Sequence, residues 1–333
     1  MDPTQNDPTL GSWRSWHAED APIRIGVSSC LLGEEVRFDG GHKRDRFVTD
    51  VLGSWVQWSS VCPEVDVGMG IPRPSIRLVE APAGPRLIAS SSGEDFTERM
   101  LAYSEAKTTE LQQLDLDGYI LKKNSPSCGM ERISVYRGQG SQRNGVGLFA
   151  ETLMRRWPHL PVEEDGRLND PSLRENFIER VFCRNRWRTM VRRGVSRRRL
   201  VEFHTAHKML LRSHSEAGYA RLGRLVASAG KMPDAELSAR YEEELQSTMR
   251  TKTTVKKHAN VLMHALGYFK LLLQPIEKRE LLTAIEDYRL GLMPLIVPST
   301  LLRFNIRKYE VGYLLGQLYF DPHPKELMLR NHC

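Results

Sequence analysis

The sequence contains no run of about 18 apolar residues, the length that a membrane-spanning helix requires, so we expect no membrane span. Residues 1–21 lack the charged start and apolar stretch of a secretory signal, and we interpret them as a flexible, polar tail. Cysteine is scarce, with 5 among 333 residues. Without a signal, such cysteines are expected to be thiols that serve a metal or catalysis rather than disulfides. These absences predict a cytoplasmic protein without a membrane partner.

Two common motifs are also missing. No G-x-G-x-x-G opens the first predicted helix, so a dinucleotide cofactor is not expected. No two cysteines have the C-x₂-C spacing that is frequent in structural zinc sites. Any metal centre must therefore take its ligands from distant segments of the chain.

The first half of the chain alternates short apolar runs with helical stretches. Strands are expected at residues 23–30, 59–62, 76–79, 86–89, 118–121 and 133–136, and helices at residues 46–58, 93–114 and 145–157. This alternation is typical of a parallel sheet with helices on both faces. We therefore predict an α/β Rossmann-like domain over residues 22–157.

The second half has a different pattern. Residues 158–171 are rich in Pro, Gly, Asp and Glu, which predicts a linker. Beyond this segment strand signals disappear, and apolar residues recur at helical spacing. Asn169 or Asp170 is expected to cap the first helix, with Pro171 at its first position. Residues 172–333 are thus predicted to form an all-α domain.

The two halves differ in net charge, which is −6 for residues 1–170 and +13 for residues 171–333. This asymmetry suggests that the basic helical half binds RNA, although a solvated basic surface without a partner is an alternative. Arginines next to Trp187 would pair with phosphates and stack on bases. The candidate RNA-binding residues are Arg186, Arg188, Arg197, Arg198, Arg199, Lys256 and Lys257.

Three cysteines, Cys30, Cys62 and Cys128, each follow a predicted strand. Parallel α/β folds place their functional residues at such strand ends. Three thiolates from distant loops are compatible with buried structural cysteines, a zinc site, an iron–sulfur cluster with one open iron, or a nucleophilic thiol. The spacing alone leaves these four alternatives open.

Several sequence blocks resemble the thiouracil desulfidase family. The blocks are V-S-S-C-L-L-G at residues 27–33, R-F-D-G at 37–40, V-C-P-E-V at 61–65, P-R-P at 72–74 and L-K-K-N-S-P-S-C-G at 121–129. The resemblance covers most of residues 22–157. Residues from about 190 to 333 resemble a helical domain of unknown function that occurs fused behind this module. In such fusions the implied substrate is 4-thiouridine in tRNA.

The resemblance implies a [4Fe–4S] cluster held by Cys30, Cys62 and Cys128, with one iron not ligated by protein. Cys183 and Cys333 match no ligand position, and we interpret them as a buried helix cysteine and a tail thiol. Histidines in the helical half have no cysteine or acidic cluster beside them, so we interpret them as core or RNA-facing residues. They are His204, His207, His258 and His264.

The resemblance also implies a catalytic glutamate and a catalytic serine. Glu64 matches the glutamate, and the serine is Ser125 or Ser127, of which we favour Ser125. A carboxylate at a helix start and ordinary turn chemistry are the alternative interpretations of these residues. Within the shared blocks, the residues expected to contact the substrate are Asp39, Arg73 and Lys123.

The function predicted from these features is non-redox, hydrolytic desulfuration of 4-thiouridine in tRNA, which gives uridine and hydrosulfide. One alternative is a desulfidase of free thiouracil or 4-thiouridine monophosphate, in which the helical domain is only structural. The other is a non-enzymatic iron–sulfur protein that binds RNA. The acidic residue beside Cys62 and the polar serine loop favour catalysis.

Overall fold

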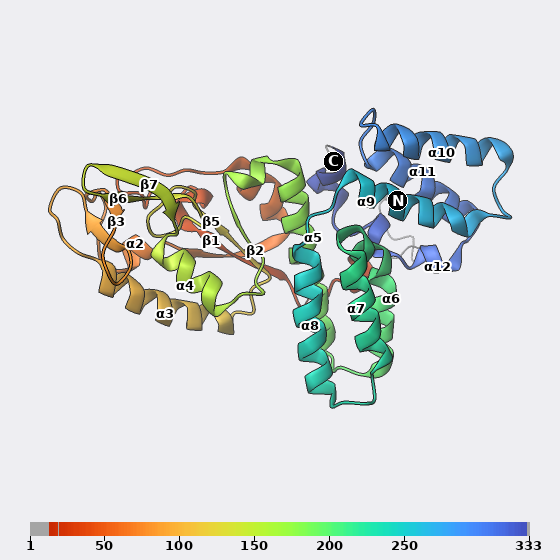
Figure 1. Ribbon diagram of the computed structural model, residues 1–333, viewed down its shortest axis with the longest axis horizontal. Helices are drawn as coiled ribbons and strands as arrows, with labels where there is room; N and C mark the ends of the chain where they lie inside the picture. The colour runs from red at the N-terminus through yellow and green to blue at the C-terminus, as the bar shows by residue number, and fades with distance from the viewer. Residues whose placement is uncertain (1–12, 19, 332–333) are drawn as a thin grey trace. The chain divides into compact units, whose positions relative to one another are not determined.

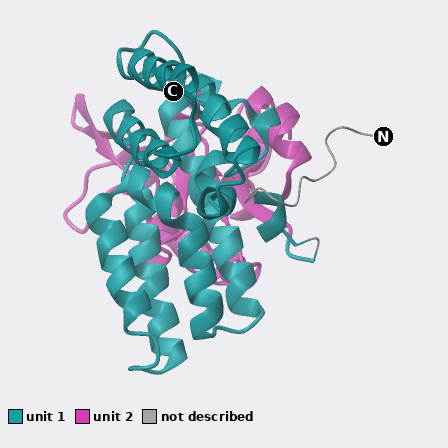
Figure 2. Ribbon diagram, turned by 90° about the vertical axis from the view of Figure 1, so that its right-hand side faces the viewer, with its two compact units in different colours: residues 1–21, 170–333 teal, residues 22–169 magenta. Residues whose placement is uncertain are grey.

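The computed structural model describes residues 13–18 and 20–331. They form two compact units, which Figure 2 distinguishes by colour. The first is Pro22–Asn169, and the second contains Asp170 onwards together with the described residues up to Ala21. No helix among the described residues is long and apolar enough to cross a membrane.

The first unit contains a four-stranded, fully parallel sheet. Its order is β2 (Val56–Val61), β1 (Ile23–Ser28), β5 (Gly118–Leu121) and β8 (Val162–Glu164). In the register, Ser28 pairs with Val61 and Val27 with Ile120, so the carboxyl ends of β1, β2 and β5 lie at one edge. The predicted α/β fold with a parallel sheet is confirmed.

Two helices, α3 (Thr97–Gln113) and α4 (Leu148–Arg156), pack on one face of this sheet (Figure 1). Tyr119 on β5 is fully buried and contacts Phe149 on α4. Its ring fills the space where Gly26 of β1 has no side chain, because a Cβ there would lie 2.2 Å from the ring. Close packing of the two central strands therefore depends on a glycine beside an aromatic residue.

A second sheet has the order β4 (Arg86–Ala89), β3 (Ile76–Val79), β6 (Ile133–Arg137) and β7 (Gly140–Gly145). β3 and β6 are parallel, whereas the outer pairs are antiparallel. A bulge in the β6–β7 pair shifts the register between Ile133 and Ser134. The strands expected at 76–79, 86–89 and 133–136 are confirmed, but β7, which is polar and exposed, was not predicted.

Two predicted segments of this unit were wrong. The helix expected at residues 46–58 consists of short turns, Phe47–Val51 and Leu52–Ser54, and the chain is already in β2 from Val56. Residues 158–171, expected to be a linker, contain the edge strand β8. Its Glu163 and Glu164 are buried and accept hydrogen bonds, so this acidic composition reflects specific contacts rather than a flexible connection.

The second unit is helical, as predicted, and its described residues contain no β-strand. Its main helices are α5 (Pro171–Arg192), α6 (Arg197–His214), α7 (Glu216–Ala227), α8 (Asp234–Arg250), α9 (Val255–Leu266), α10 (Pro275–Arg289) and α11 (Ile296–Lys308), followed by the short α12 (Gly312–Leu315). Asp170 caps α5, since its side chain accepts a hydrogen bond from the Leu173 N–H. The predicted cap with Pro171 at the first position is thereby confirmed.

A flexible tail was expected at residues 1–21. Residues 1–12 and residue 19 lie outside the described residues, and the others in this range are described. Trp13–Trp16 forms the short helix α1. Trp13 is buried and contacts Phe182 of α5 edge-on. This stretch is therefore packed structure and not a flexible tail, because its tryptophans bury apolar surface in the helical unit.

The helical unit also contains a buried network of charges. Glu175 and Glu179 lie one turn apart on α5, and Arg330 pairs with them at 3.2 and 3.0 Å. The His214 Nε2 lies 3.0 Å from Glu179. Burial alone would raise the pKa of Glu179, but the His214 hydrogen bond and the nearby cations lower it. Groups of this kind are costly to bury unless paired, and here each carboxylate has a cationic partner.

Buried neutral histidines make the stability of this unit depend on pH. Burial, then the nearby Arg330 cation, lowers the pKa of His258 to about 3. An unfolded histidine binds a proton with a pKa of about 6.5. The stability due to neutral His258 is therefore complete above this pH and is lost as the pH falls towards 3, by about 1.4 kcal/mol per pH unit.

We expect His258→Gln to reduce the difference between the unfolding free energies of the whole chain at pH 7 and pH 5.5, measured by urea unfolding. The matched control is His264→Gln on the same helix, whose side chain is exposed and should contribute much less. Equal pH dependence in wild type and His258→Gln would contradict the assignment of a buried neutral histidine.

Candidate active site

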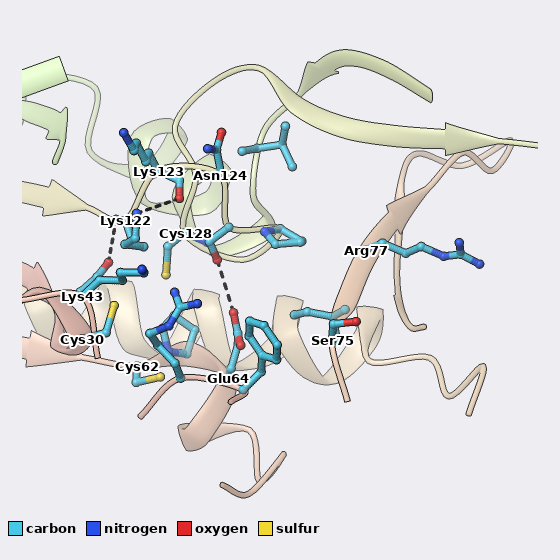
Figure 3. A pocket seen from close by; sticks show the side chains of 18 of the residues that line it. Cys30, Lys43, Cys62, Glu64, Ser75, Arg77, Lys122, Lys123, Asn124 and Cys128 are labelled. Carbon is cyan, nitrogen blue, oxygen red and sulfur yellow. Dashed lines mark hydrogen bonds between the residues drawn. The ribbon is translucent and has the colours of Figure 1, made fainter. Parts of the chain in front are cut away.

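The three cysteines lie around one space at the carboxyl edge of the parallel sheet (Figure 3). Cys30 is in the turn that follows β1, Cys62 directly follows β2, and Cys128 is in the loop after β5. Because these strands are adjacent and parallel, their ends bring the three loops together. The prediction that each of these cysteines follows a strand agrees with this geometry.

The thiols are shielded from water. Cys30 and Cys128 are buried, and Cys62 is partly buried. Burial raises the pKa of all three thiols, that of Cys30 to about 11, where the Lys122 cation partly opposes the rise. At Cys128 the negative charge of Glu64 adds to the effect of burial.

The spacing of the sulfur atoms bears on what they could hold. Among the described residues, the group that places three potential ligand atoms within 4.8 Å of one another is Glu175, Glu179 and His323, and the three cysteines do not form such a group. A zinc–sulfur bond measures about 2.3 Å, so two sulfurs on one ion cannot lie farther apart than about 4.6 Å. The cysteine geometry therefore disfavours a single ion bound by all three.

The Glu175, Glu179 and His323 group of the helical unit is unsuited to a metal for another reason. Arg330 already pairs with both carboxylates, and a second cation there would meet its positive charge. His204, His207 and His258 are buried and His264 is exposed. The interpretation of the buried three as core residues is thus borne out.

Glu64 lies in the short helix α2 (Pro63–Asp66), which Pro63 begins. Its Oε2 accepts hydrogen bonds from Arg73 Nη2 at 2.6 Å and Arg73 Nε at 3.0 Å. Its Oε1 accepts one from Ser127 Oγ at 2.7 Å and lies 3.3 Å from Ser125 Oγ. One carboxylate oxygen thus faces a cation, and the other faces both serines.

The two serines have different environments. Ser127 is fully buried and its hydroxyl also lies 3.7 Å from Cys128 Sγ. Ser125 lines the cavity, and its Oγ accepts hydrogen bonds from the Cys128 and Ser127 N–H groups. A molecule in the cavity can therefore reach Ser125. Ser127 does not line the cavity and instead donates a hydrogen bond to Glu64 Oε1.

The serine–cysteine loop is fixed from two sides. The first amides of α4 donate to its carbonyls: Leu148 N to Pro126 O, and Phe149 N to Ser127 O. This approach requires Gly147, since a Cβ there would lie 2.5 Å from the Ser127 carbonyl oxygen. At the other side, Asp165 accepts a hydrogen bond from the Lys123 N–H and pairs with Lys122. Asp165, which directly follows β8, was not predicted as a site residue, because its segment was expected to be a linker.

The cavity has a volume of about 690 Å³, and the three cysteines, Glu64, Ser125, Arg73 and Lys123 line it. Arg73 is almost fully buried and forms an ion pair with Glu64. This contact differs from the predicted contact of Arg73 with the substrate. Asp39 is exposed, binds the Arg37 side chain and the Gly41 N–H, and is not among the cavity residues. Its contacts are those of a loop-forming residue rather than of a substrate ligand.

The prediction that Arg186 binds RNA is wrong. This side chain is fully buried, and its guanidinium binds His207 and the Pro322 carbonyl oxygen, because α5 is enclosed by other segments of the unit. Lys257 donates to the carbonyls of His214 and Lys252. These two side chains therefore have structural partners.

The remaining candidates are more accessible. Arg188 is half-buried, whereas Arg197, Arg198, Arg199 and Lys256 are exposed. Arg198 forms an ion pair with Glu202, and Arg199 bonds the carbonyls of Arg193 and Gly194. Within the described part of the chain, Arg197 and Lys256 have no ion pair.

Three cavity arginines outside the shared blocks were not predicted as site residues: Arg77, Arg132 and Arg143. The polar segment around Arg143 gave no strand signal, so its place beside the cavity was not evident. A signal did exist, because Arg77 lies within one apolar run that was expected to be a strand and Arg132 directly precedes another.

Comparison with known proteins identifies the class of the first unit. Residues 25–165 match the family model described as 2-thiouracil desulfurase, and residues 208–324 match a model described as a protein of unknown function, DUF1722. The α/β unit therefore matches the 2-thiouracil desulfurase family model, as the sequence blocks indicated. The predicted pairing with a helical domain of unknown function is also confirmed.

Among solved structures, the chain is similar to the [4Fe-4S]-dependent thiouracil desulfidase TudS, with 31% identity over 44% of this chain and 94% of that chain and a TM-score of 0.38. It is also similar to two uncharacterized proteins. YbgA of Escherichia coli is 28% identical over 47% of this chain and 94% of its own length. YbbK of Bacillus subtilis is 29% identical over 44% of this chain and 98% of its own length.

Proposed function

We propose that the protein is an iron–sulfur-dependent desulfidase that converts 4-thiouridine in tRNA to uridine. The observation that carries this proposal is the convergence of Cys30, Cys62 and Cys128 with Glu64 and Ser125 on one cavity. The reaction replaces C=S by C=O: water adds to carbon 4, the carbon–sulfur bond breaks, and sulfur leaves as hydrosulfide. No electrons are transferred overall.

The cysteine set fits a [4Fe–4S] cluster. Three thiols on separate loops, too far apart for one shared ion, suit ligands of three different irons, with the fourth iron left without a protein ligand. When bound, the cluster would supply a soft Lewis acid for the thiocarbonyl sulfur. The buried thiols would have to lose their protons on binding it.

Glu64 and Ser125 provide the groups that the water needs. Glu64 Oε1 is the oxygen that Arg73 leaves available, and it lies 3.3 Å from Ser125 Oγ. Ser125 is the serine that lines the cavity. A water in the cavity would donate a hydrogen bond to Ser125 and pass its proton, through that hydroxyl, to Glu64 Oε1. Ser127 would orient the same oxygen.

The helical unit is the proposed tRNA-binding part. Its net charge of +13 over residues 171–333 favours a polyanion. Exposed cations without a carboxylate partner are the ones available for phosphates, and Arg197 and Lys256 meet this condition in the described part of the chain. The alternative substrate, free thiouracil or its nucleotide, would require only the cavity.

Replacing Cys30, Cys62 or Cys128 by Ala should abolish normal cluster loading, because each supplies one of the three thiolates. The measurement is iron and sulfide content after anaerobic reconstitution, together with the visible spectrum. Cys183→Ala is the matched control, since Cys183 is buried in α5 of the helical unit and is not a cavity residue. About four irons per chain in Cys128→Ala would refute the ligand assignment.

Ser125→Ala should retain iron but lower the rate on thiouracil by about 10²-fold, the scale of a lost acid–base group. Glu64→Gln should do the same. Ser127→Ala should cost less, because Ser125 remains beside Oε1. The check is kcat with iron content measured in parallel, and a larger loss in Ser127→Ala than in Ser125→Ala would reverse the assignment.

Arg197→Gln and Lys256→Gln should weaken tRNA binding and reduce the salt slope of log Kd by about one unit each, because each phosphate contact releases counterions. Turnover of free thiouracil should not change. Arg198→Gln is the comparison, since Glu202 already neutralises that charge. Unchanged tRNA binding and desulfuration in the double variant would favour the small-molecule substrate.

A further inference from the structure

The helical unit contains a small pocket of its own, between α1, the C-terminal end of α5 and the first turns of α6. Three arginines line this α5–α6 pocket: Arg186, Arg193 and Arg199. Trp16 and Met190 supply apolar sides. The pocket has a volume of about 200 Å³, which is less than drug-sized ligands need, so it suits a compact group.

Helical spacing explains why these side chains meet. Arg186, Thr189 and Arg193 follow one another at intervals of three and four residues, so they share one face of α5 and its C-cap. Arg199 lies in the first turn of α6, where its Nη1 donates to the carbonyls of Arg193 and Gly194. The turn between the two helices therefore fixes the position of the pocket.

Arg186 is a fully buried cation whose hydrogen-bond partners are neutral. Its Nε donates to His207 Nε2 at 3.0 Å, and its Nη1 donates to the Pro322 carbonyl oxygen at 2.8 Å. Burial, and then the charge of Arg186, hold the pKa of His207 well below its usual range. The imidazole is thus uncharged and cannot balance the guanidinium.

No carboxylate among residues 13–18 and 20–331 forms an ion pair with Arg186. Glu179 and Asp321 act on it through space, but Glu179 is already paired with Arg330 and His214. A buried cation is costly unless an anion is paired with it. The helical unit therefore holds a positive charge beside the pocket without a direct counter-charge.

Two buried polar atoms at the pocket lack a hydrogen-bond partner within the described part of the chain: Arg186 Nη2 and Thr189 Oγ1. Their residues line the pocket and are only 2% and 5% exposed. Buried donors of this kind are expensive to leave unsatisfied. A guanidinium N–H and a hydroxyl on one small pocket together call for an acceptor that carries negative charge.

The outer part of the pocket is also positive. Arg193 is exposed, and in the part of the chain that the structure describes its side chain has no ion pair. Glu202 is the carboxylate among the lining residues, and Arg198 neutralises it at 2.8 Å. The pocket thus presents arginines from its buried end to its mouth.

We infer that the α5–α6 pocket binds a small free oxyanion with the chemistry of inorganic phosphate. Arg186 Nη2 and Thr189 Oγ1 would donate to it at the buried end, and Arg193 at the exposed end. A free anion fits better than an RNA backbone, because a diester phosphate carries chain on both sides and the two inner donors are almost completely enclosed. Since the anion supplies the missing counter-charge, its binding stabilises the helical unit.

The inference concerns the helical unit and does not depend on the proposed desulfidase reaction. The test is binding of inorganic phosphate to the full-length, anaerobically reconstituted protein, measured by calorimetry at constant ionic strength. The thermal unfolding midpoint is recorded over the same phosphate concentrations and should rise with them in wild type. Thr189→Val and Arg193→Gln should each weaken phosphate binding about tenfold and reduce that rise.

Val keeps the shape of Thr189 without the hydroxyl, so this variant tests the site even if Arg186→Met, which should abolish binding there, does not fold. The matched control is Arg192→Gln. It removes the same charge from the neighbouring residue, which is exposed and does not line the pocket, and it should leave phosphate binding unchanged. Phosphate that enters the cavity of the α/β unit would respond to none of these changes.

Equal phosphate affinity and equal thermal shifts in wild type, Thr189→Val and Arg193→Gln would overturn the inference. Loss of the phosphate-dependent thermal shift on saturation with unmodified tRNA would assign the pocket to an RNA phosphate and would overturn the free anion as its occupant. A shift that depends on Thr189 and persists with tRNA bound would support the inference, whether or not the protein desulfurates a thiolated uracil.

Discussion

The Glu64 carboxylate connects the separate parts of the site. Arg73 donates to its Oε2 and also to the carbonyls of Val36 and Gly70, so one guanidinium ties three loops together. The Val36 carbonyl lies 3.8 Å from Cys62 Sγ as well. A buried carboxylate and a buried cation are each costly alone, and their mutual pairing removes most of that cost. Because Oε2 is occupied by Arg73, Oε1 is the oxygen that can accept a proton in the proposed reaction, together with Ser125 beside it.

The parts of the site that could be predicted are those with a local cause. A proline or glycine after an apolar run ends a strand, so the positions of Cys30, Cys62 and Cys128 at strand ends were predictable from neighbouring residues. The same holds for the Asp170 cap with Pro171. The role of the three cysteines as cluster ligands came from the family resemblance. The roles of Glu64 and the serines required family resemblance, because a carboxylate after Pro63 also suits an ordinary helix start.

The remaining features depend on partners distant in sequence. β8 has three residues and an acidic composition, and it becomes a strand only by pairing with β5. Glu164 of β8 and the following Asp165 accept hydrogen bonds from the backbone N–H groups of Met130 and Lys123, which lie 34 and 42 residues earlier in the chain. β7 is likewise polar and gains its structure from the β6 ladder. No pattern of apolar residues marks strands of this kind, since such patterns report burial and these edge strands expose most of their side chains.

Net charge was a coarse guide to where an anion would bind. The helical unit has the large positive charge, yet Arg186 and Arg330 are enclosed in its core, and Lys257 is bound to backbone carbonyls. The α/β unit has a slight acidic excess, yet five cations that line its cavity have no carboxylate partner among the described residues: Lys43, Arg77, Lys123, Arg132 and Arg143. An anion responds to the charges that it can approach and that no neighbour has neutralised, because nearby opposite charge cancels the field and bulk salt screens the rest. By that measure the cations of the α/β cavity are as accessible to an anion as those of the basic half.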